Sequence, residues 1–522
     1  DVTVDDTTYE DVQKPVLAKT YLELLGGSIN YAYGGGNNVT VTDSTVICFD
    51  NPSEVVVSIE DANGEELLND DRFRTRMGIN LAYSYPSSDA FHVGRFYGGN
   101  NLAEMAIRPT WNLKSGKIRN LYSGGNQGAM TSPDGLLLEI PATSTIVVDN
   151  LYGGCRMADV KPTVNGEYKA VSNLPGYNFP PGLSARVLIR GGDVNNVYGG
   201  NDITGRVYGG SAVGIRTSVC GDVYGGGNGS YAYTDNPAFE GDETYGDLYY
   251  TVPAGKTSVE ALNDFRPNAE QVSIHLLGNS ASDPAYIGGS VYCGGNSATL
   301  KTSKSKPMVE LKIGSYVVAD KVFLGNNGVN MIKYNAAGKT VAGTDSIGAA
   351  EGVLYTMQRT DLSGNGSKFS SLDLENAATF EAYMQGVAMP LVPNLVYDDE
   401  TKGDGATYIP YTSLIGSFFC GGNVGSMSAP GTIDLDNVNS IRIYNKFVGG
   451  CNDAYVPAHT GFNAACDGIG SLLVDSAADY ISQLLPFALH IASQQQPTAC
   501  GRVDQHFTQE IDGILCYSFA LG

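Results

Sequence analysis

A short motif of one aromatic residue followed by glycines recurs along most of the chain and strongly constrains its fold. Most copies continue with two or three glycine or other small residues, and many end in asparagine. Successive copies lie 25 residues apart from Tyr97 to Tyr122, 30 from Tyr122 to Tyr152, and 31 from Tyr292 to Phe323. Further copies begin at Tyr33, Tyr198, Tyr208, Tyr224, Phe419 and Phe447. Repetition at a nearly constant interval predicts a solenoid, in which each repeat packs on its neighbours.

The motif has the chemistry of a corner at the end of a strand. Short segments rich in β-branched and aromatic residues, such as 196–198 and 222–224, precede it. Glycine permits a positive φ where a side chain would collide with the next coil, and asparagine tolerates the left-handed conformation. We expect the aromatic rings and the asparagine amides to form ladders along the long axis. The expected members are Tyr33, Asn37, Tyr97, Asn100, Tyr122, Asn126, Tyr152, Tyr198, Asn201, Tyr224, Asn228, Tyr292, Asn296 and Asn423.

These observations predict an all-β chain, a right-handed parallel β-helix (solenoid) with loop insertions and terminal caps. We expect an N-terminal cap or first strand at 1–29, the β-helix at 30–465 with an insertion around 330–410, and a C-terminal cap at 466–522. Apolar spacing over 469–491 predicts an amphipathic helix in that cap. A β-sandwich of ordinary hairpins also uses Gly-Gly turns, but the repeat interval and fixed residue order argue against it.

The charge and the cysteine content limit the possible partners and the possible disulfide bonds of the chain. The chain has 55 acidic and 32 basic residues and a formal net charge of −23, which opposes nucleic acid as a partner. It contains no apolar run of about 18 to 20 residues, so we expect no transmembrane segment. Nine cysteines cannot all pair within one chain. Four of them belong to the repeat and are expected to be free, packed thiols: Cys155, Cys293, Cys420 and Cys451.

Several stretches resemble a known family. They are 92–101 (HVGRFYGGNN), 107–111 (IRPTW), 118–126 (IRNLYSGGN) and 151–160 (LYGGCRMADV). They are similar to cell-surface parallel β-helix proteins of Bacteroidales bacteria with repeated Tyr-Gly-Gly-Gly-Asn motifs. The resemblance covers most of residues 30–460 and implies export to an extracellular or cell-surface location. It carries over no catalytic residues.

Two aspartates are candidates for acid-base chemistry. Asp434 and Asp436 alternate along a strand-like segment, so both are expected on one face. Paired carboxylates cleave glycosidic bonds in many glycan-active enzymes. A solvated strand face is the competing interpretation, because alternation alone places any two such residues together.

Other candidates concern ligands and metals. Acidic clusters at Asp70 and Asp71 and at Asp398 and Asp399 could bind calcium, although they lack the spacing of known calcium loops. No other cofactor is expected, since the five histidines have no metal-ligand spacing. The tyrosines Tyr231, Tyr233 and Tyr245 could stack on sugars or anchor a protein, or could cover the edge of the solenoid.

Three functions remain open on these grounds. The first is a non-enzymatic, surface-exposed binding or scaffold protein, adhesin-like, with a glycan or a surface protein as its ligand. The second is a polysaccharide lyase or glycoside hydrolase, which only analogy of fold supports. The third is an accessory subunit of an outer-membrane complex. Clustered Asp, Arg or Lys in a cleft would favour the enzyme, and a flat, tyrosine-rich wall would favour binding.

Overall fold

The computed structural model describes a core of residues 16–53, 91–173, 179–230, 264–279, 283–301, 307–314 and 316–328. It also describes shorter segments at 2–4, 7–9, 359–361, 365–371, 413–419, 421–423, 426–427, 432–434, 441–448, 463–465, 472–474, 506–511 and 514–519. These residues are almost entirely in strands and the turns between them, so the prediction of an all-β chain is confirmed.

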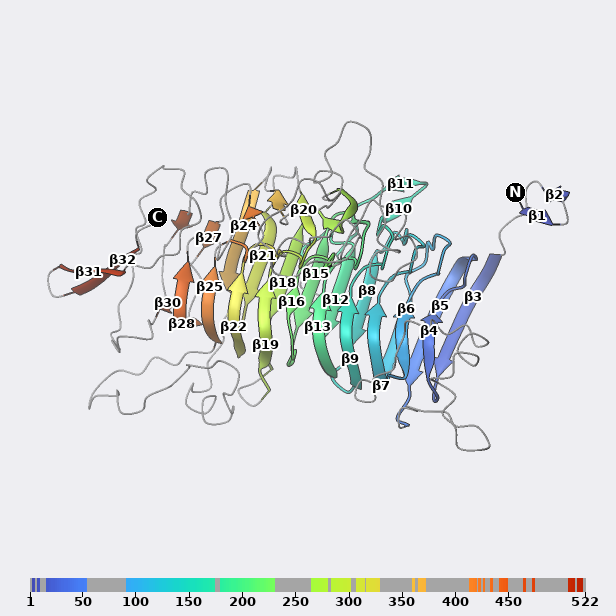
Figure 1. Ribbon diagram of the computed structural model, residues 1–522, viewed down its shortest axis with the longest axis horizontal. Helices are drawn as coiled ribbons and strands as arrows, with labels where there is room; N and C mark the ends of the chain where they lie inside the picture. Colours follow the sequence, from blue (N-terminus) through green and yellow to red (C-terminus); the bar gives the residue numbers. More distant parts are fainter. Residues whose placement is uncertain are drawn as a thin grey trace, which may run out of the picture.

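Most strands belong to three long parallel sheets that run along an elongated body (Figure 1). The 13-stranded sheet contains β3 (Val16–Leu24), β4 (Ile29–Tyr33), β5 (Thr40–Asp50), β6 (Val93–Tyr97), β7 (Thr110–Tyr122), β9 (Thr145–Tyr152), β13 (Asp193–Tyr198), β16 (Val223–Tyr224), β19 (Ala285–Tyr292), β22 (Val317–Phe323), β25 (Ser413–Phe419), β28 (Ile441–Val448) and β30 (Leu472–Val474). The eight-stranded sheet contains β8 (Leu136–Ile140), β12 (Ala185–Ile189), β15 (Ser211–Ile215), β18 (Val272–Leu276), β21 (Pro307–Ile313), β24 (Asn365–Ser371), β27 (Thr432–Asp434) and β29 (Asn463–Ala465).

The five-stranded sheet is formed by β14 (Arg206–Val207), β17 (Asn268–Ala269), β20 (Thr299–Lys301), β23 (Arg359–Asp361) and β26 (Ser426–Met427). Three antiparallel pairs complete the described strands: β1 (Val2–Val4) with β2 (Thr7–Tyr9), β10 (Thr163–Val164) with β11 (Glu167–Tyr168), and β31 (His506–Ile511) with β32 (Ile514–Phe519).

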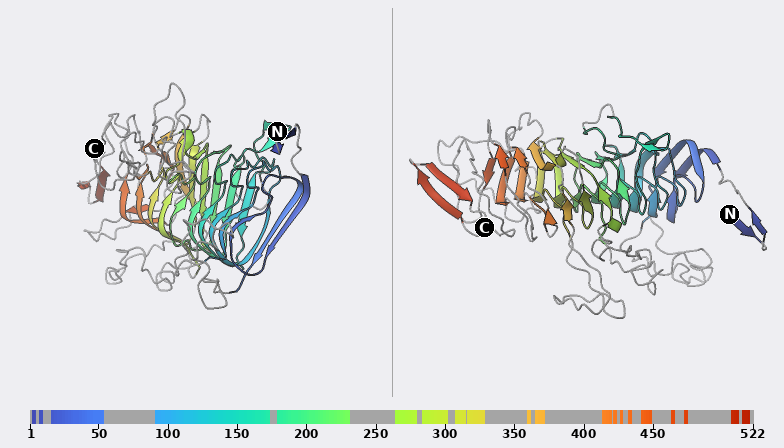
Figure 2. Two further views of the ribbon diagram at one scale, coloured as in Figure 1. Left: turned by 45° about the vertical axis from the view of Figure 1, so that its right-hand side comes forward. Right: turned by 90° about the horizontal axis from the view of Figure 1, so that it is seen from above.

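The chain visits the three long sheets in turn. From β12 to β28 its strands fall in the eight-stranded, the 13-stranded and the five-stranded sheet, and then in the eight-stranded sheet again. Each strand pairs in parallel with the strand one circuit later, as Ala185 pairs with Ser211 and Ser211 with Val272. Figure 2 shows the strands stacked one after another along the axis. This order of strands is consistent with the predicted parallel β-helix.

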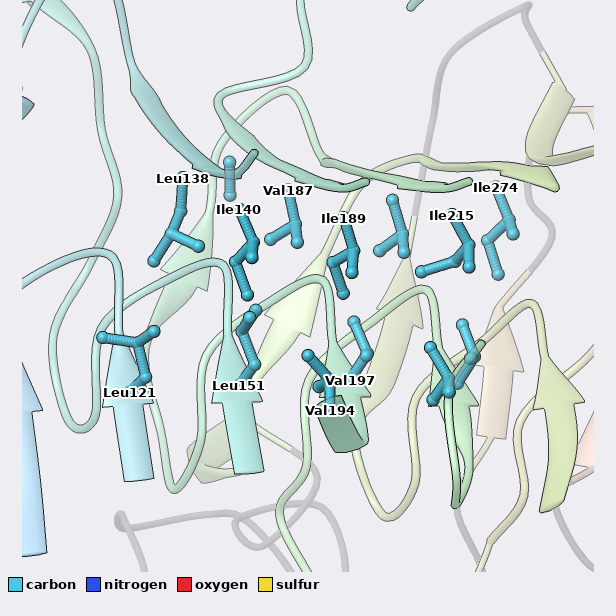
Figure 3. Close-up of a cluster of buried hydrophobic side chains, with 14 of the residues drawn as sticks. Leu121, Leu138, Ile140, Leu151, Val187, Ile189, Val194, Val197, Ile215 and Ile274 are labelled. Atoms are coloured by element: carbon cyan, nitrogen blue, oxygen red, sulfur yellow. The ribbon is translucent and has the colours of Figure 1, made fainter. Parts of the chain in front are cut away.

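The sheets enclose one continuous apolar core. Alternate side chains of β8, β12, β15, β18 and β21 point inward, among them Val187, Ile215 and Ile274. They meet residues of the 13-stranded sheet such as Leu151 and Val197 (Figure 3). All five are fully buried. Burial of a side chain of this size stabilises the fold by roughly 1.5–3 kcal/mol, so a core that repeats in every coil explains the preference for valine, isoleucine and leucine at these positions.

Residues 16–24 form β3, the first strand of the 13-stranded sheet, which is one of the two alternatives expected for the N-terminal segment. Two other expectations differ from the structure. Within the insertion expected around 330–410, residues 359–361 and 365–371 form β23 and β24, which continue two of the sheets. Residues 472–474, placed in a helix, form β30 and pair with β28. Leu-Leu-Val fits either element, and the neighbouring strand edge favours a strand here. The rest of residues 330–410 and of residues 469–491 lies outside the described part of the chain.

Candidate functional site

The aromatic residues of the repeat form one continuous stack on the 13-stranded sheet. Neighbouring ring centroids are 4.5 to 4.9 Å apart and the rings lie within 11° of parallel. This spacing equals the distance between paired strands. The stack runs through Tyr33, Tyr97, Tyr122, Tyr152, Tyr198, Tyr224, Tyr292, Phe323 and Phe419. The predicted aromatic ladder is therefore confirmed.

This stack is a packing element that a sugar does not reach. All of its rings from Tyr97 onward are buried, and they form a cluster separate from the apolar core. Burial raises the pKa of Tyr292 to about 12. Glycine is required after the aromatic residue where the next coil comes close: a Cβ at Gly199 would overlap the carbonyl oxygen of Gly225. Other copies have Ser123, Cys293 or Leu324 at this position.

The second ladder is polar and occupies the fourth position after the aromatic residue. The amide of Asn101 donates to Asn37 Oδ1 at 2.7 Å, and that of Asn126 donates to Asn101 Oδ1 at 2.8 Å. Further along the axis, Asn296 donates to Asn228 Oδ1 at 2.9 Å. Hydrogen bonds join one run of this position, Asn37, Asn101, Asn126 and Arg156, and a second run, Asp202, Asn228, Asn296, Asn327 and Asn423. Five of the predicted asparagines belong to these runs, namely Asn37, Asn126, Asn228, Asn296 and Asn423.

The prediction that Asn100 and Asn201 belong to this ladder is wrong. Each lies at the third position after its aromatic residue, because its copy of the motif is one glycine shorter before the asparagine. Asn201 Oδ1 accepts the backbone N–H of Cys155 at 2.8 Å, and its Nδ2 donates to the carbonyl oxygen of Ala158 at 2.9 Å. Asn100 Oδ1 accepts the N–H of Gly36 at 2.8 Å in the same way. These buried asparagines therefore connect the corners of successive coils by hydrogen bonds to the backbone.

Tyr208 begins a copy of the motif but does not join the aromatic stack. It follows β14 of the five-stranded sheet, whereas the stacked residues end strands of the 13-stranded sheet. Its ring lies 5.6 Å from that of Tyr168, tilted by 43°. The guanidinium carbon of Arg206 lies 4.5 Å from the Tyr208 ring centroid, and Lys161 Nζ lies 5.4 Å from it. We call Lys161, Tyr168, Arg206, Tyr208 and Glu270 the Tyr168 cluster.

A tight hairpin positions Tyr168 in this cluster. Strands β10 and β11 pair across the dipeptide Asn165-Gly166, whose φ angles are +53° and +80°. An Asn-Gly turn with two positive φ angles matches the right-handed twist of a hairpin. The hairpin lies at the margin of the stacked strands (Figure 1), and Tyr168 is 38% exposed. Its ring is thus accessible from solvent, in contrast to the rings of the stack.

Ionic contacts hold the cationic side of the cluster. Arg206 Nη2 forms an ion pair with Glu270 Oε1, and the backbone N–H of Arg206 donates to Asp159 Oδ1 at 2.8 Å. Glu270 is buried, whereas the Arg206 side chain is 44% exposed. Burial and the nearby Glu270 raise the pKa of Tyr168. An exposed aromatic face beside fixed cations can bind a sugar ring with an acidic substituent or the side chains of a protein.

A second group of polar side chains lies on the outer face of the eight-stranded sheet. Ser273 Oγ and His275 Nε2 are 3.1 Å apart on β18, and the neighbouring strand β21 carries the ion pair between Lys312 Nζ and Glu310 Oε1 at 3.1 Å. The ring of Phe179 lies 5.4 Å from that of His275. The Ser–His contact has the distance of a nucleophile and its base.

The burial of that pair argues against its use in catalysis. Ser273 is fully buried and His275 is 8% exposed, so a substrate does not reach the hydroxyl in this conformation. Burial lowers the pKa of His275 to about 3, assisted by the positive charges of Lys312 and Arg216. The histidine is therefore neutral at physiological pH and packs as an uncharged ring.

Most of the predicted catalytic, metal and ligand-binding residues lie outside the described part of the chain. These are the catalytic candidate Asp436, the metal candidates Asp70, Asp71, Asp398 and Asp399, and the ligand-binding candidates Tyr231, Tyr233 and Tyr245. Asp434 ends β27 and pairs with Ala465 of β29. Among the described residues there is no group of three or more His, Cys, Asp or Glu side chains that could hold a metal ion.

Sequence reasoning missed the Tyr168 cluster. The pair Asn165-Gly166 was a usable hairpin signal. The position of Glu270 beside Arg206 was not, because 64 residues separate them and only the pairing of β14 with β17 brings them together.

No family model, curated protein or solved structure matches this chain. In the portion that the structure describes, no helix is both long and apolar enough to cross a membrane.

Proposed function

We propose that this protein is a secreted or surface-attached right-handed parallel β-helix that binds a glycan or a surface protein through the Tyr168 cluster. The circuit of strands through three parallel sheets supports the solenoid. The resemblance of 92–101 and 151–160 to Bacteroidales surface proteins supports the extracellular location.

The observation that carries the binding proposal is the exposed ring of Tyr168, which lies against the half-buried Tyr208 and its two neighbouring cations. Tyrosine and arginine are enriched among the residues that carry most of the binding energy of an interface. Tyr168 has an exposed face, and Arg206 and Lys161 lie beside its partner Tyr208. The burial of the repeat tyrosines and of Ser273 leaves the Tyr168 cluster as the strongest described candidate.

A binding and cleavage assay tests the proposal. The purified chain is incubated with neutral and uronate-containing polysaccharides and with surface proteins, with and without calcium, and both retention and chain cleavage are measured. We expect retention without cleavage, and Tyr168→Ala should weaken it by roughly ten- to a hundredfold, the effect of a hot-spot residue.

The variant Leu102→Ala is the matched control, because Leu102 is a similarly exposed apolar residue outside the cluster. It should leave retention unchanged. Retention that is equal in the Tyr168→Ala and Leu102→Ala variants would remove the cluster from the proposal. Cleavage of any polysaccharide would replace the binding function with that of a lyase or hydrolase.

A further inference from the structure

The first strand of the 13-stranded sheet has an open edge. Among the described strands, β3 pairs with β5 alone, and it is the terminal strand at one end of the stack (Figure 2). An unpaired edge offers backbone donors and acceptors to another strand. Val16, Leu17 and Tyr21 are exposed on this strand, and Leu25 is exposed directly after it; Tyr21 is 65% exposed and Leu25 58%.

The side chains of β3 separate into two sets. From Lys19 to Leu25, exposed positions alternate with half-buried ones, and Leu22 and Leu24 pack against the core. The exposed residues that alternate with the half-buried ones are Lys19, Tyr21, Glu23 and Leu25. Leu17 is exposed too, but the pairing with β5 shifts register between Leu17 and Lys19, and Leu17 pairs with the buried Val41. The alternating exposed set is complementary to itself in charge when reversed about Tyr21, because lysine then lies opposite glutamate.

We propose that β3 pairs antiparallel with β3 of a second copy of this chain, with the two-fold axis at Tyr21. Lys19 of each copy then lies opposite Glu23 of the other. Opposite charges placed directly across two strands stabilise a sheet. An isologous contact of this kind closes after two subunits, so it gives a dimer and no filament.

The neighbouring registers are less favourable. A two-fold axis at Thr20 would place Leu17 opposite Glu23 and Lys19 opposite Tyr21, which separates the charges. A two-fold axis at Leu22 would place Lys19 opposite Leu25. The present contacts of the exposed set compete little with the dimer: the Lys19–Asp43 ion pair at 3.2 Å joins side chains that are 70% and 58% exposed.

The half-buried set also favours the dimer. With the axis at Tyr21, Thr20 lies opposite Leu22, and the exposed Ala18 lies opposite Leu24. Leu22 and Leu24 pack against the core, so the apolar interior of one solenoid would continue toward that of the other.

Disulfide trapping tests the register. Two antiparallel residues directly opposite each other have Cα atoms about 4.5–5.5 Å apart, which suits a disulfide. In a background with Cys48→Ser and Cys220→Ser, Tyr21→Cys should form a covalent dimer on mild oxidation. Lys19→Cys alone should not, since its two copies would lie four strand positions, or about 13 Å, apart. Mixing Lys19→Cys with Glu23→Cys should restore the crosslink.

Light scattering tests the dimer without new cysteines. The unmodified chain should be dimeric at micromolar concentration. Lys19→Glu should raise the dissociation constant of the dimer about tenfold, because two pairs of opposite charge become two pairs of like charge. The double variant Lys19→Glu/Glu23→Lys should return it to the original value. A monomeric chain at tens of micromolar, or equal crosslinking of Tyr21→Cys and Lys19→Cys, would overturn the proposal.

Discussion

Tyr97 offers a sharp test of the aromatic stack. Its ring is fully buried between Tyr33, 4.9 Å away, and Tyr122, 4.7 Å away. Its hydroxyl is also buried and makes no hydrogen bond within the described structure. The hydroxyl of Tyr122, by contrast, donates to Asp202 Oδ2 at 2.8 Å. Removing one oxygen atom from each tyrosine should therefore change stability in opposite directions.

The magnitudes follow from these contacts. Tyr97→Phe keeps both stacked neighbours and removes a buried hydroxyl without a partner, so the free energy of unfolding should rise by about 1 kcal/mol. Tyr122→Phe removes a buried hydrogen bond to a carboxylate and should cost about 2 kcal/mol. Tyr97→Ala opens a cavity and removes two stacking contacts, with a cost of about 3–5 kcal/mol.

Denaturant unfolding measures all three changes. Trp111 is the only tryptophan of the chain, and its ring lies 5.4 Å from that of Phe96, the residue before Tyr97. Its fluorescence therefore reports on this part of the solenoid. If Tyr97→Phe destabilises the protein as much as Tyr122→Phe does, the Tyr97 hydroxyl has a partner in solution and the reasoning is wrong.

Three further predictions follow from the same structure. Gly199→Ala should destabilise the protein by more than about 2 kcal/mol in denaturant unfolding, since its Cβ would overlap backbone; Gly26→Ala, with open space around it, should be neutral, and equal effects would contradict the corner geometry. The raised pKa of Tyr292, about 12 against 10 when unfolded, means that its stabilising contribution is complete below pH 10 and is lost as the pH rises toward 12; unfolding at pH 8 and 11 should show this fall, and unchanged stability would oppose it. Iodoacetamide with peptide mapping should modify the exposed Cys220 and spare the buried Cys155, whose pKa burial raises to about 12; rapid labelling of Cys155 would show that the corner opens.

The repeated elements of this protein were predictable because their signals are local. Tyr198 and Tyr224 end equivalent strands, and the glycine that follows each is required by the neighbouring coil. The wrong prediction for Asn201 also came from a local signal, the asparagine that follows the glycines. This copy of the motif has one glycine fewer, so Asn201 lies one position earlier and is buried, and Asp202 occupies the ladder position.

The sequence alone was sufficient to predict the all-β structure, the aromatic stack and most of the polar ladder. Each of these depends on a residue type and on its distance from the next copy of the motif. Only the tertiary structure decided which copy of the motif joins the stack. Tyr208 has the same local sequence as the stacked residues, but it follows a strand of another sheet and meets Tyr168 and Arg206 there. The Tyr168 cluster joins residues from 161 to 270, and contacts across several coils depend on how the coils stack, which no local pattern encodes.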